Sequence, residues 1–276
     1  MSKRREILDR ISALGDIEDI LGAMKSLAFL ETWRISAFIE LQHSAVQVIE
    51  TALADFTAFY RPDGSSVVPQ RDMLCVIGAE RGFCGDFNTG LVNAAESILA
   101  ATARPTEVIV AGNRLAQSWG ERRPLPSVIE GASVAEEVPE VLNRLLDRFS
   151  SLLDNGEQTQ SVGLTVLYHR EQSIASCRLL PYPELPQPSR LPAYPPYLTL
   201  PPRKLFLELD DQYLYALLHA VYYDSLLAEN QKRLEHMDRA INKLHEKLEV
   251  LSRRQNQLRQ GEIIEDIEVI LLATMA

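Results

Sequence analysis

In the stretch LEHMDRAINKLHEKLEVL (Leu234–Leu251), large apolar residues recur at alternating steps of three and four. Those residues are Leu234, Met237, Ile241, Leu244, Leu248 and Leu251. This spacing is typical of the seam of a coiled coil, where one stripe of a helix packs against a partner helix. Neither proline nor glycine occurs between Arg203 and Gln260, so the pattern predicts one very long C-terminal helix.

The first sixty residues carry a similar apolar stripe. It runs through Leu14, Ile17, Leu21, Met24, Ala28, Glu31, Ile35 and Phe38, and, after a step of three where four is due, through Leu41, Ala45, Val48 and Ala52. Such a phase slip changes the supercoil locally without ending the helix. Neither helix can bury its stripe alone, so we expect the two to form an antiparallel coiled coil. An ordinary bundle of shorter helices is the alternative.

The middle of the chain has a different pattern. MLCVIG (Met73–Gly78) and EVIVAG (Glu107–Gly112) are typical of buried strands, and helical patterns follow each of them. Another helical pattern covers Ala135 to Leu153, and SVGLTVLYHR and SIASCRLLPY predict a closing pair of strands. Nine of the 15 prolines fall between Pro181 and Pro202, which predicts an extended or looped segment.

We therefore predict an α/β fold in which a Rossmann-like globular domain is inserted between long N- and C-terminal helices that form an antiparallel coiled coil. The domain should have a parallel core capped by an antiparallel strand pair. The expected divisions are residues 1–60 for the first helix, 70–202 for the globular domain and 203–276 for the last helix.

The loop ERGFCGDFNTG (Glu80–Gly90) follows the first strand, where open parallel sheets usually bind ligands. Its glycines match neither the dinucleotide fingerprint nor the phosphate loop, and Asp86 would repel a phosphate. A nucleophilic Cys84 would need a base, and His169 at a strand end could approach it. We interpret the loop as a structural turn, and we expect no catalytic residue, cofactor or metal. The residues of this turn are Arg81, Gly82, Cys84, Gly85 and Asn88.

Composition excludes several classes of protein. A net charge of −10 argues against nucleic-acid binding, which needs a basic surface. The three cysteines are widely separated, so a disulfide framework or a zinc site is not expected. The apolar run VILLATMA near the C-terminus has eight residues, against the roughly 20 that a membrane helix needs. Trp33 and Trp119 are expected to pack rather than to bind a cofactor.

The order of these features resembles the gamma subunit of rotary F-type ATPases. The family marker R-G-L-C-G-G-x-N is matched at five positions of the turn, and RIS…AMK near the N-terminus and NQLRQGEIIEDI near the C-terminus are similar to the family's helices. The resemblance covers essentially the whole chain. SLAFLETWR replaces a basic, alanine-rich stretch, with Glu31 where lysine is common, and Asp86 replaces a glycine. These departures indicate a divergent branch, such as the alternate bacterial enzymes.

The resemblance implies a central rotor shaft that is not itself an enzyme. Its implied partners are the alpha and beta subunits of the head, the epsilon subunit and the membrane c-ring. Membrane contact would be only through the c-ring, at the cytoplasmic face of the bacterial inner membrane, with either proton or sodium as the coupling ion. By family correspondence, Met24, Lys25, Arg259 and Gln260 would couple the shaft to the head. A coiled-coil scaffold or adaptor is the alternative function, and an enzyme that uses a cysteine or a nucleotide is a third.

Overall fold

The computed structural model describes residues 3–60, 69–122, 126–154, 162–181, 194–195 and 197–275. The chain divides into two compact units, one made of Met1–Phe29 with Arg233–Ala276 and one made of Leu30–Lys232. Both long helices are confirmed, as α1 (Lys3–Phe59) and α5 (Pro202–Met275). Most of the proline-rich stretch lies outside the described residues. No helix in the described ranges is long and apolar enough to cross a membrane.

The unit Leu30–Lys232 contains a five-stranded sheet in the order β3-β2-β1-β4-β5. Its strands are β1 (Arg71–Ile77), β2 (Thr106–Ala111), β3 (Ser127–Ile129), β4 (Val162–Arg170) and β5 (Ser173–Leu180). The first four run parallel and β5 runs antiparallel to β4, which confirms the predicted parallel core with an antiparallel cap. The short edge strand β3 was not predicted, because three residues are too few to show a strand pattern.

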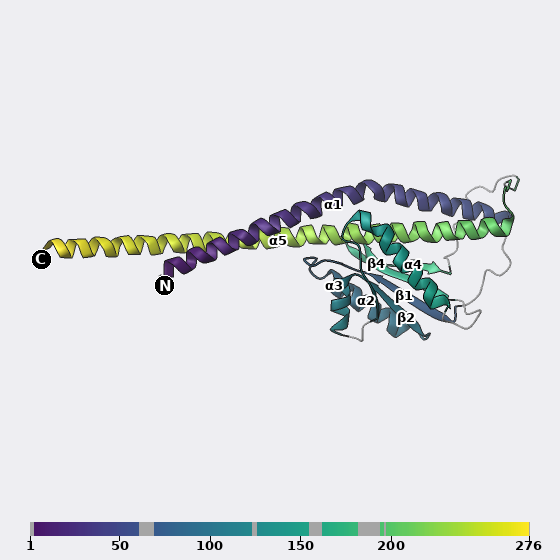
Figure 1. The fold of residues 1–276 in the computed structure, drawn as a ribbon, viewed down its shortest axis with the longest axis horizontal. Coiled ribbons are helices and arrows are strands. Elements are labelled where there is room, and N and C mark those ends of the chain that lie inside the picture. The colour runs from purple at the N-terminus through teal and green to yellow at the C-terminus, as the bar shows by residue number, and fades with distance from the viewer. Residues whose placement is uncertain are drawn as a thin grey trace. The chain divides into compact units, whose positions relative to one another are not determined.

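Helices cover both faces of this sheet, which is why β1 is buried along nearly its whole length. On one face, Leu74 and Val76 pack with α2 (Phe87–Ala101) and α3 (Asn113–Gly120). On the other face, Cys75 and Ile77 pack with α4 (Val138–Asp154), which follows the short 3-10 helix η1 (Ala135–Glu137), and with α5 (Figure 1). Helix α5 is therefore part of the core of the α/β unit.

The coiled-coil seam predicted on α5 is confirmed. Met237 is fully buried, and the other seam residues from Leu234 to Leu251 are half-buried, while the residues between them are mostly exposed. The interruption at Gln255 does not end the seam, since Gln255 and Leu258 are both half-buried. The alternating steps of three and four therefore identified the inner face of this helix.

The seam predicted on α1 is wrong at Ile17, which is 46% exposed, and again beyond Ile35. Phe38, Leu41 and Val48 are more than half exposed. The protected positions are instead Ile35, Ile39, Gln42, Val46, Ile49, Leu53 and Phe56. The phase slip therefore comes as two steps of four around Ile35, not as two steps of three. The two candidate stripes are almost equally apolar, so contacts with the rest of the unit select between them. Trp33 is also mostly exposed, contrary to the expectation that it packs, whereas Trp119 is buried.

Side-chain contacts show that α1 and α5 run antiparallel. Within the unit of the two chain ends, Arg4 pairs with Glu262 at 3.0 Å and His245 contacts Glu18 at 2.5 Å. Within the α/β unit, Tyr213 donates a hydrogen bond to Glu50 at 2.8 Å. In each unit, positions later in α1 contact positions earlier in α5, as the predicted antiparallel coiled coil requires.

Candidate functional site: the loop after β1 and the paired helices

The loop after β1 is closed by Asn88 at the start of α2. The Asn88 Oδ1 accepts a hydrogen bond from the Ala79 N–H at 3.0 Å, which joins the two ends of the loop. Between them, Phe83 and Gly85 both have positive φ angles, of 67° and 60°. A phenylalanine pays a steric cost in this region that glycine does not, so the tight turn uses one permissive and one strained residue. Phe83 is also half exposed.

Glu80 ties this loop to the next two loops at the same edge of the sheet. Its carboxylate accepts hydrogen bonds from the Asn113 N–H at 2.9 Å, the Asn113 side-chain amide at 2.6 Å and the Gly131 N–H at 2.8 Å. Asn113 begins α3 after β2, and Gly131 follows β3. A carboxylate of the protein thus binds the backbone donors that could otherwise bind an anion at a helix N-terminus.

Helix α5 covers the carboxyl end of β1. The Ser225 hydroxyl donates to the Ile77 carbonyl at 3.3 Å, and the Cys84 thiol lies 3.9 Å from the buried Glu229 carboxylate. In an open α/β sheet this is the region where a ligand enters. In the described part of this chain, Glu80 and α5 fill it with the protein's own side chains.

The Cys84 sulfur is surrounded by acceptor oxygens. Besides Glu229, its sulfur contacts the Gly82 carbonyl at 3.4 Å, and acceptor oxygens stabilise a thiol rather than its anion. His169, the base considered for it, donates from Nε2 to the Phe87 carbonyl at 3.0 Å, and its ring stacks on Phe87. Burial lowers the pKa of His169 below its ordinary value. This arrangement supports packing rather than nucleophilic chemistry.

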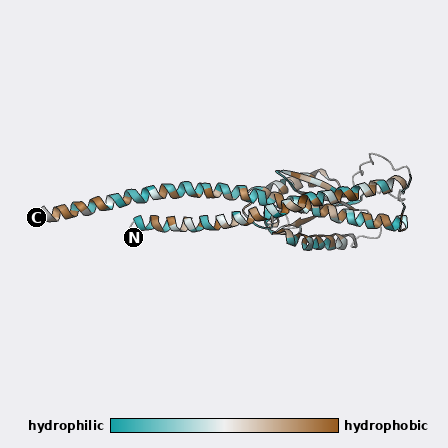
Figure 2. Ribbon diagram, turned by 90° about the horizontal axis from the view of Figure 1, so that it is seen from above, coloured by the Kyte–Doolittle hydropathy of each residue, from teal (hydrophilic) through white to brown (hydrophobic). Residues whose placement is uncertain are grey.

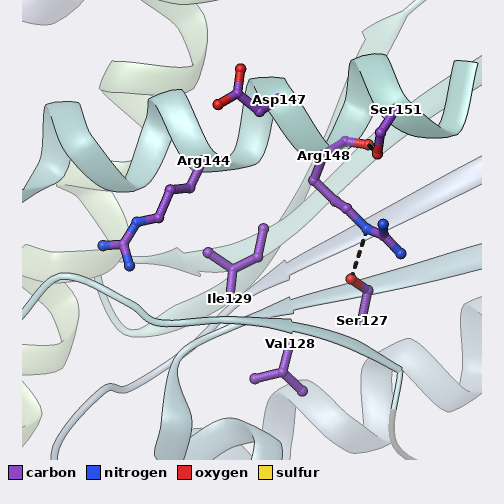
Figure 3. Close-up of a pocket in the computed structure, with 7 residues that line it drawn as sticks. All are labelled: Ser127, Val128, Ile129, Arg144, Asp147, Arg148 and Ser151. Atoms are coloured by element: carbon purple, nitrogen blue, oxygen red, sulfur yellow. Dashed lines mark hydrogen bonds between the residues drawn. The ribbon is translucent and has the colours of Figure 1, made fainter. Parts of the chain in front are cut away.

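A shallow hollow of about 570 Å³ lies between the edge strand β3 and helix α4 (Figure 3). It is lined by Ser127, Val128, Ile129, Arg144, Asp147, Arg148 and Ser151. Arg148 donates to the Ser127 hydroxyl at 2.9 Å, and Arg144 pairs with Glu130 at 3.3 Å. Both arginines are thus bound by the chain itself, and none of the site residues predicted from the sequence lies here.

The predicted coupling residues fall into two separate groups in the unit of the chain ends. Lys25 forms an ion pair with Asp238, and Met24 beside it is half-buried. Arg259 and Gln260 are exposed, and neither side chain forms a hydrogen bond or ion pair within the described residues. Position 259 is 21 residues beyond 238 along α5, or about 31 Å at 1.5 Å per residue. The structure therefore does not bring the two groups together.

The sequence reasoning missed the buried polar residues of α5. Asp224, Ser225, Glu229, Asn230 and Arg233 are all buried. Asp224 contacts α1 and β4, Ser225 contacts the end of β1, and Glu229 contacts the loop after it. The sequence did contain an indication of them, because these polar residues interrupt an otherwise apolar helical segment. Charged residues are rarely buried without partners, but the sequence alone does not show which residues are buried.

A family model described as ATP synthase matches residues 3–276. The ATP synthase gamma chain of Saccharopolyspora erythraea is 26% identical, over 98% of this chain and 96% of that protein. The gamma chain of Ruminococcus albus is 23% identical over 100% and 99%. A chain of the Euglena gracilis mitochondrial ATP synthase OSCP/F1/c-ring structure shares the fold, with a TM-score of 0.64 and 12% identity over 99% of this chain and 94% of that one. Since the family model spans nearly the whole sequence, the chain belongs to the ATP synthase family, among its gamma chains.

Proposed function

We propose that this chain is the central rotor shaft of an F-type ATP synthase. It couples ion flow through a membrane c-ring to ATP synthesis or hydrolysis in a head of alpha and beta subunits. The observation that carries the proposal is the antiparallel pairing of two helices of 57 and 74 residues in a chain of this family. Two helices joined along a seam resist bending and twisting better than one, as a shaft that transmits torque must.

The C-terminal end of α5 suits a sliding contact. Arg4 at the start of α1 reaches Glu262, so α5 continues for 13 residues, 263–275, beyond that contact. The exposed large apolar residues of this end are Ile263, Ile264, Ile267, Val269, Ile270, Leu271 and Leu272, which appear as brown bands near the C-terminus in Figure 2. Apolar contacts are non-directional, so such a surface can turn inside a collar without breaking specific bonds.

Arg259 is the strongest candidate for a coupling contact with a catalytic subunit. Its guanidinium is exposed, and a planar fork of donors can bind a carboxylate and release it as the shaft turns. Gln260 beside it offers a neutral donor and acceptor. Lys25 is already paired with Asp238, so we assign it and Met24 a weaker role in the same coupling.

The remaining parts of the proposal concern the setting of the shaft. The globular unit, with an epsilon subunit, would sit on the c-ring, and this would be the chain's only membrane contact. The chain would be a peripheral, non-catalytic subunit at the cytoplasmic face of a bacterial inner membrane. It would serve a proton- or sodium-translocating complex. The divergent residues of α1, including Glu31 and Trp33, are compatible with an alternate-type enzyme.

Co-purification tests the function directly. A tagged copy of the chain, expressed in its own host, should bring down alpha and beta subunits in a three-to-three-to-one ratio with itself. Purification with neither subunit, from membranes that contain both, would contradict the proposal and favour a coiled-coil adaptor.

The coupling residues are tested with matched arginine variants. Arg259→Ala should lower ATP-driven ion pumping in membrane vesicles while the complex still assembles. Arg254→Ala, another exposed arginine of α5, is the control and should leave pumping unchanged. Met24→Lys should also lower pumping, because an added charge can bind a head carboxylate too tightly for release. Wild-type pumping by both Arg259→Ala and Met24→Lys would remove these residues from the coupling mechanism.

A further inference from the structure

Three elements of the α/β unit meet at one buried carboxylate. Asp224 lies on α5, and its two oxygens are 3.2 and 3.3 Å from the His43 Nε2 on α1. The Arg170 Nε, at the end of β4, is 3.8 Å from the same carboxylate. Asp224 is buried, whereas the His43 and Arg170 side chains are partly exposed. One side chain of α5 therefore contacts both the other long helix and the sheet.

Three other polar contacts of α1 in this unit join two elements each. Glu31 accepts from the Ala135 N–H at 3.4 Å, and Arg34 pairs with Glu136 at 3.4 Å, so both reach η1. Glu50 accepts from Tyr213 on α5. Water and salt screen the electrostatic interactions of a buried carboxylate less than those of an exposed one. The contacts of Asp224 with His43 and Arg170 are therefore well suited to hold these elements together.

Resting on the proposed rotor function, we propose that Asp224 is a positioning residue that fastens α1 and the β4–β5 hairpin to α5. Turning force in the paired helices then reaches the sheet through this shared carboxylate as well as through apolar packing. Loss of the carboxylate would let the two helices and the hairpin shift against each other under load. Coupling would then suffer more than folding.

The first experiment tests the junction in the isolated full-length chain, independently of any rotor role. His43→Ala, Asp224→Asn and the double variant are compared by urea unfolding. We expect His43→Ala to change the unfolding equilibrium constant at least about threefold more in the wild-type background than beside Asp224→Asn. Asp211→Asn, which removes an exposed carboxylate from the same helix, should show no such dependence on His43. If the change in the unfolding equilibrium constant of the double variant equals the product of the two single changes to within about twofold, the two residues act independently. That result would overturn the proposed contact.

The second experiment tests the transmission of force. In the assembled complex, we expect Asp224→Asn and His43→Ala to lower the ions pumped per ATP hydrolysed at least about twofold, with Asp211→Asn at the wild-type ratio. His43 is partly exposed, so its variant keeps the test usable if Asp224→Asn folds poorly. The unfolding experiment could show that His43 and Asp224 depend on each other while His43→Ala keeps the wild-type number of ions pumped per ATP. That result would support the contact but refute its part in coupling. A wild-type chain that never assembles with alpha and beta subunits would instead refute the rotor function.

Discussion

At the scale of single residues, α5 makes polar contacts with the carboxyl edge of the sheet as well as apolar ones. Besides Ser225 and Glu229, Tyr222 takes part, since its hydroxyl accepts from the Ala132 N–H at 2.8 Å. Tyr222 and Ser225 are one helical turn apart and bind different parts of the sheet edge. Directional bonds of this kind fix the rotation and register of α5, which apolar packing alone would leave less well defined.

His219 makes the stability of this region depend on pH. It is buried on α5 between the rings of Tyr215 and Tyr223, and neither ring nitrogen has a hydrogen-bond partner in the described part of the chain. Burial lowers the pKa of His219 below its ordinary value of 6.5. The unfolded chain therefore binds the proton more readily, so stability is full above pH 6.5 and falls as the pH drops below it.

We predict that His219→Phe removes this part of the acid sensitivity. An aromatic ring keeps the edge contact with Tyr215 and the packing beside Tyr223, and it leaves no unpaired polar atom. The difference in unfolding free energy between pH 8 and pH 5.5, measured by urea titration, should be smaller in the variant than in the wild type. An equal pH dependence in His219→Phe and the wild type would contradict the burial argument.

At the scale of the elements, helix α1 has two nearly equivalent apolar stripes after Ile35. The predicted stripe contains Phe38, Leu41 and Val48, and the protected one contains Val46 and Leu53. A matched pair of leucines tests this assignment, because Leu53 is 2% exposed and Leu41 is 67% exposed.

We expect Leu53→Ala to lower the free energy of unfolding by about 2–5 kcal/mol, since it leaves a cavity in a packed cluster with Tyr213. Leu41→Ala should change the free energy of unfolding of the isolated chain by no more than about 0.5 kcal/mol. Urea unfolding of both variants provides the measurement. A larger loss for Leu41→Ala would restore the stripe predicted from the sequence.

The pairing of the helix ends can be tested by crosslinking. In a chain without its native cysteines, cysteines at Glu18 and His245 should be joined rapidly by a short bismaleimide, because these side chains touch. The pair Glu18 and Arg259 serves as the control. Position 259 lies 14 residues beyond position 245 along α5, or about 21 Å from it. Intramolecular crosslinks are detected by their altered mobility in denaturing gels. Equal yields from both pairs would contradict the antiparallel register.

At the scale of the whole molecule, the Rossmann-like sheet carries no open ligand crevice among its described residues at the end of β1. Glu80 binds the donors of the neighbouring loops, and α5 covers the strand end. Folds of this kind commonly bind nucleotides, but in this chain the sheet packs against the long helix α5.

We therefore predict that the purified chain does not hydrolyse ATP and binds it more weakly than about 1 mM. Isothermal titration calorimetry with Mg–ATP measures the binding, and phosphate release measures the hydrolysis. The same titration into assembled complex, which contains alpha and beta subunits, is the positive control. Micromolar binding by the chain alone would show that the loop after β1 is more than a structural turn.

The two long helices, and the strands and shorter helices between them apart from β3, could be predicted from the sequence alone. These features follow from local signals, namely apolar periodicity and the placement of proline and glycine, which act within a few turns of chain. The resemblance at Arg81, Gly82, Cys84, Gly85 and Asn88 also located the turn after β1. Roles for Met24, Lys25, Arg259 and Gln260 remain predictions.

Tertiary contacts were needed to show which stripe of α1 is buried, that β3 exists, and that Asp224 and Glu229 are buried. Each of these depends on residues far apart in the sequence: Ile39 and Phe38 are equally apolar, and β3 is a strand because it pairs with β2. Whether a carboxylate on α5 is buried depends on which residues of other elements contact it, as His43 and Arg170 contact Asp224. Local periodicity specifies an element, but the partner across the interface selects the face that it buries.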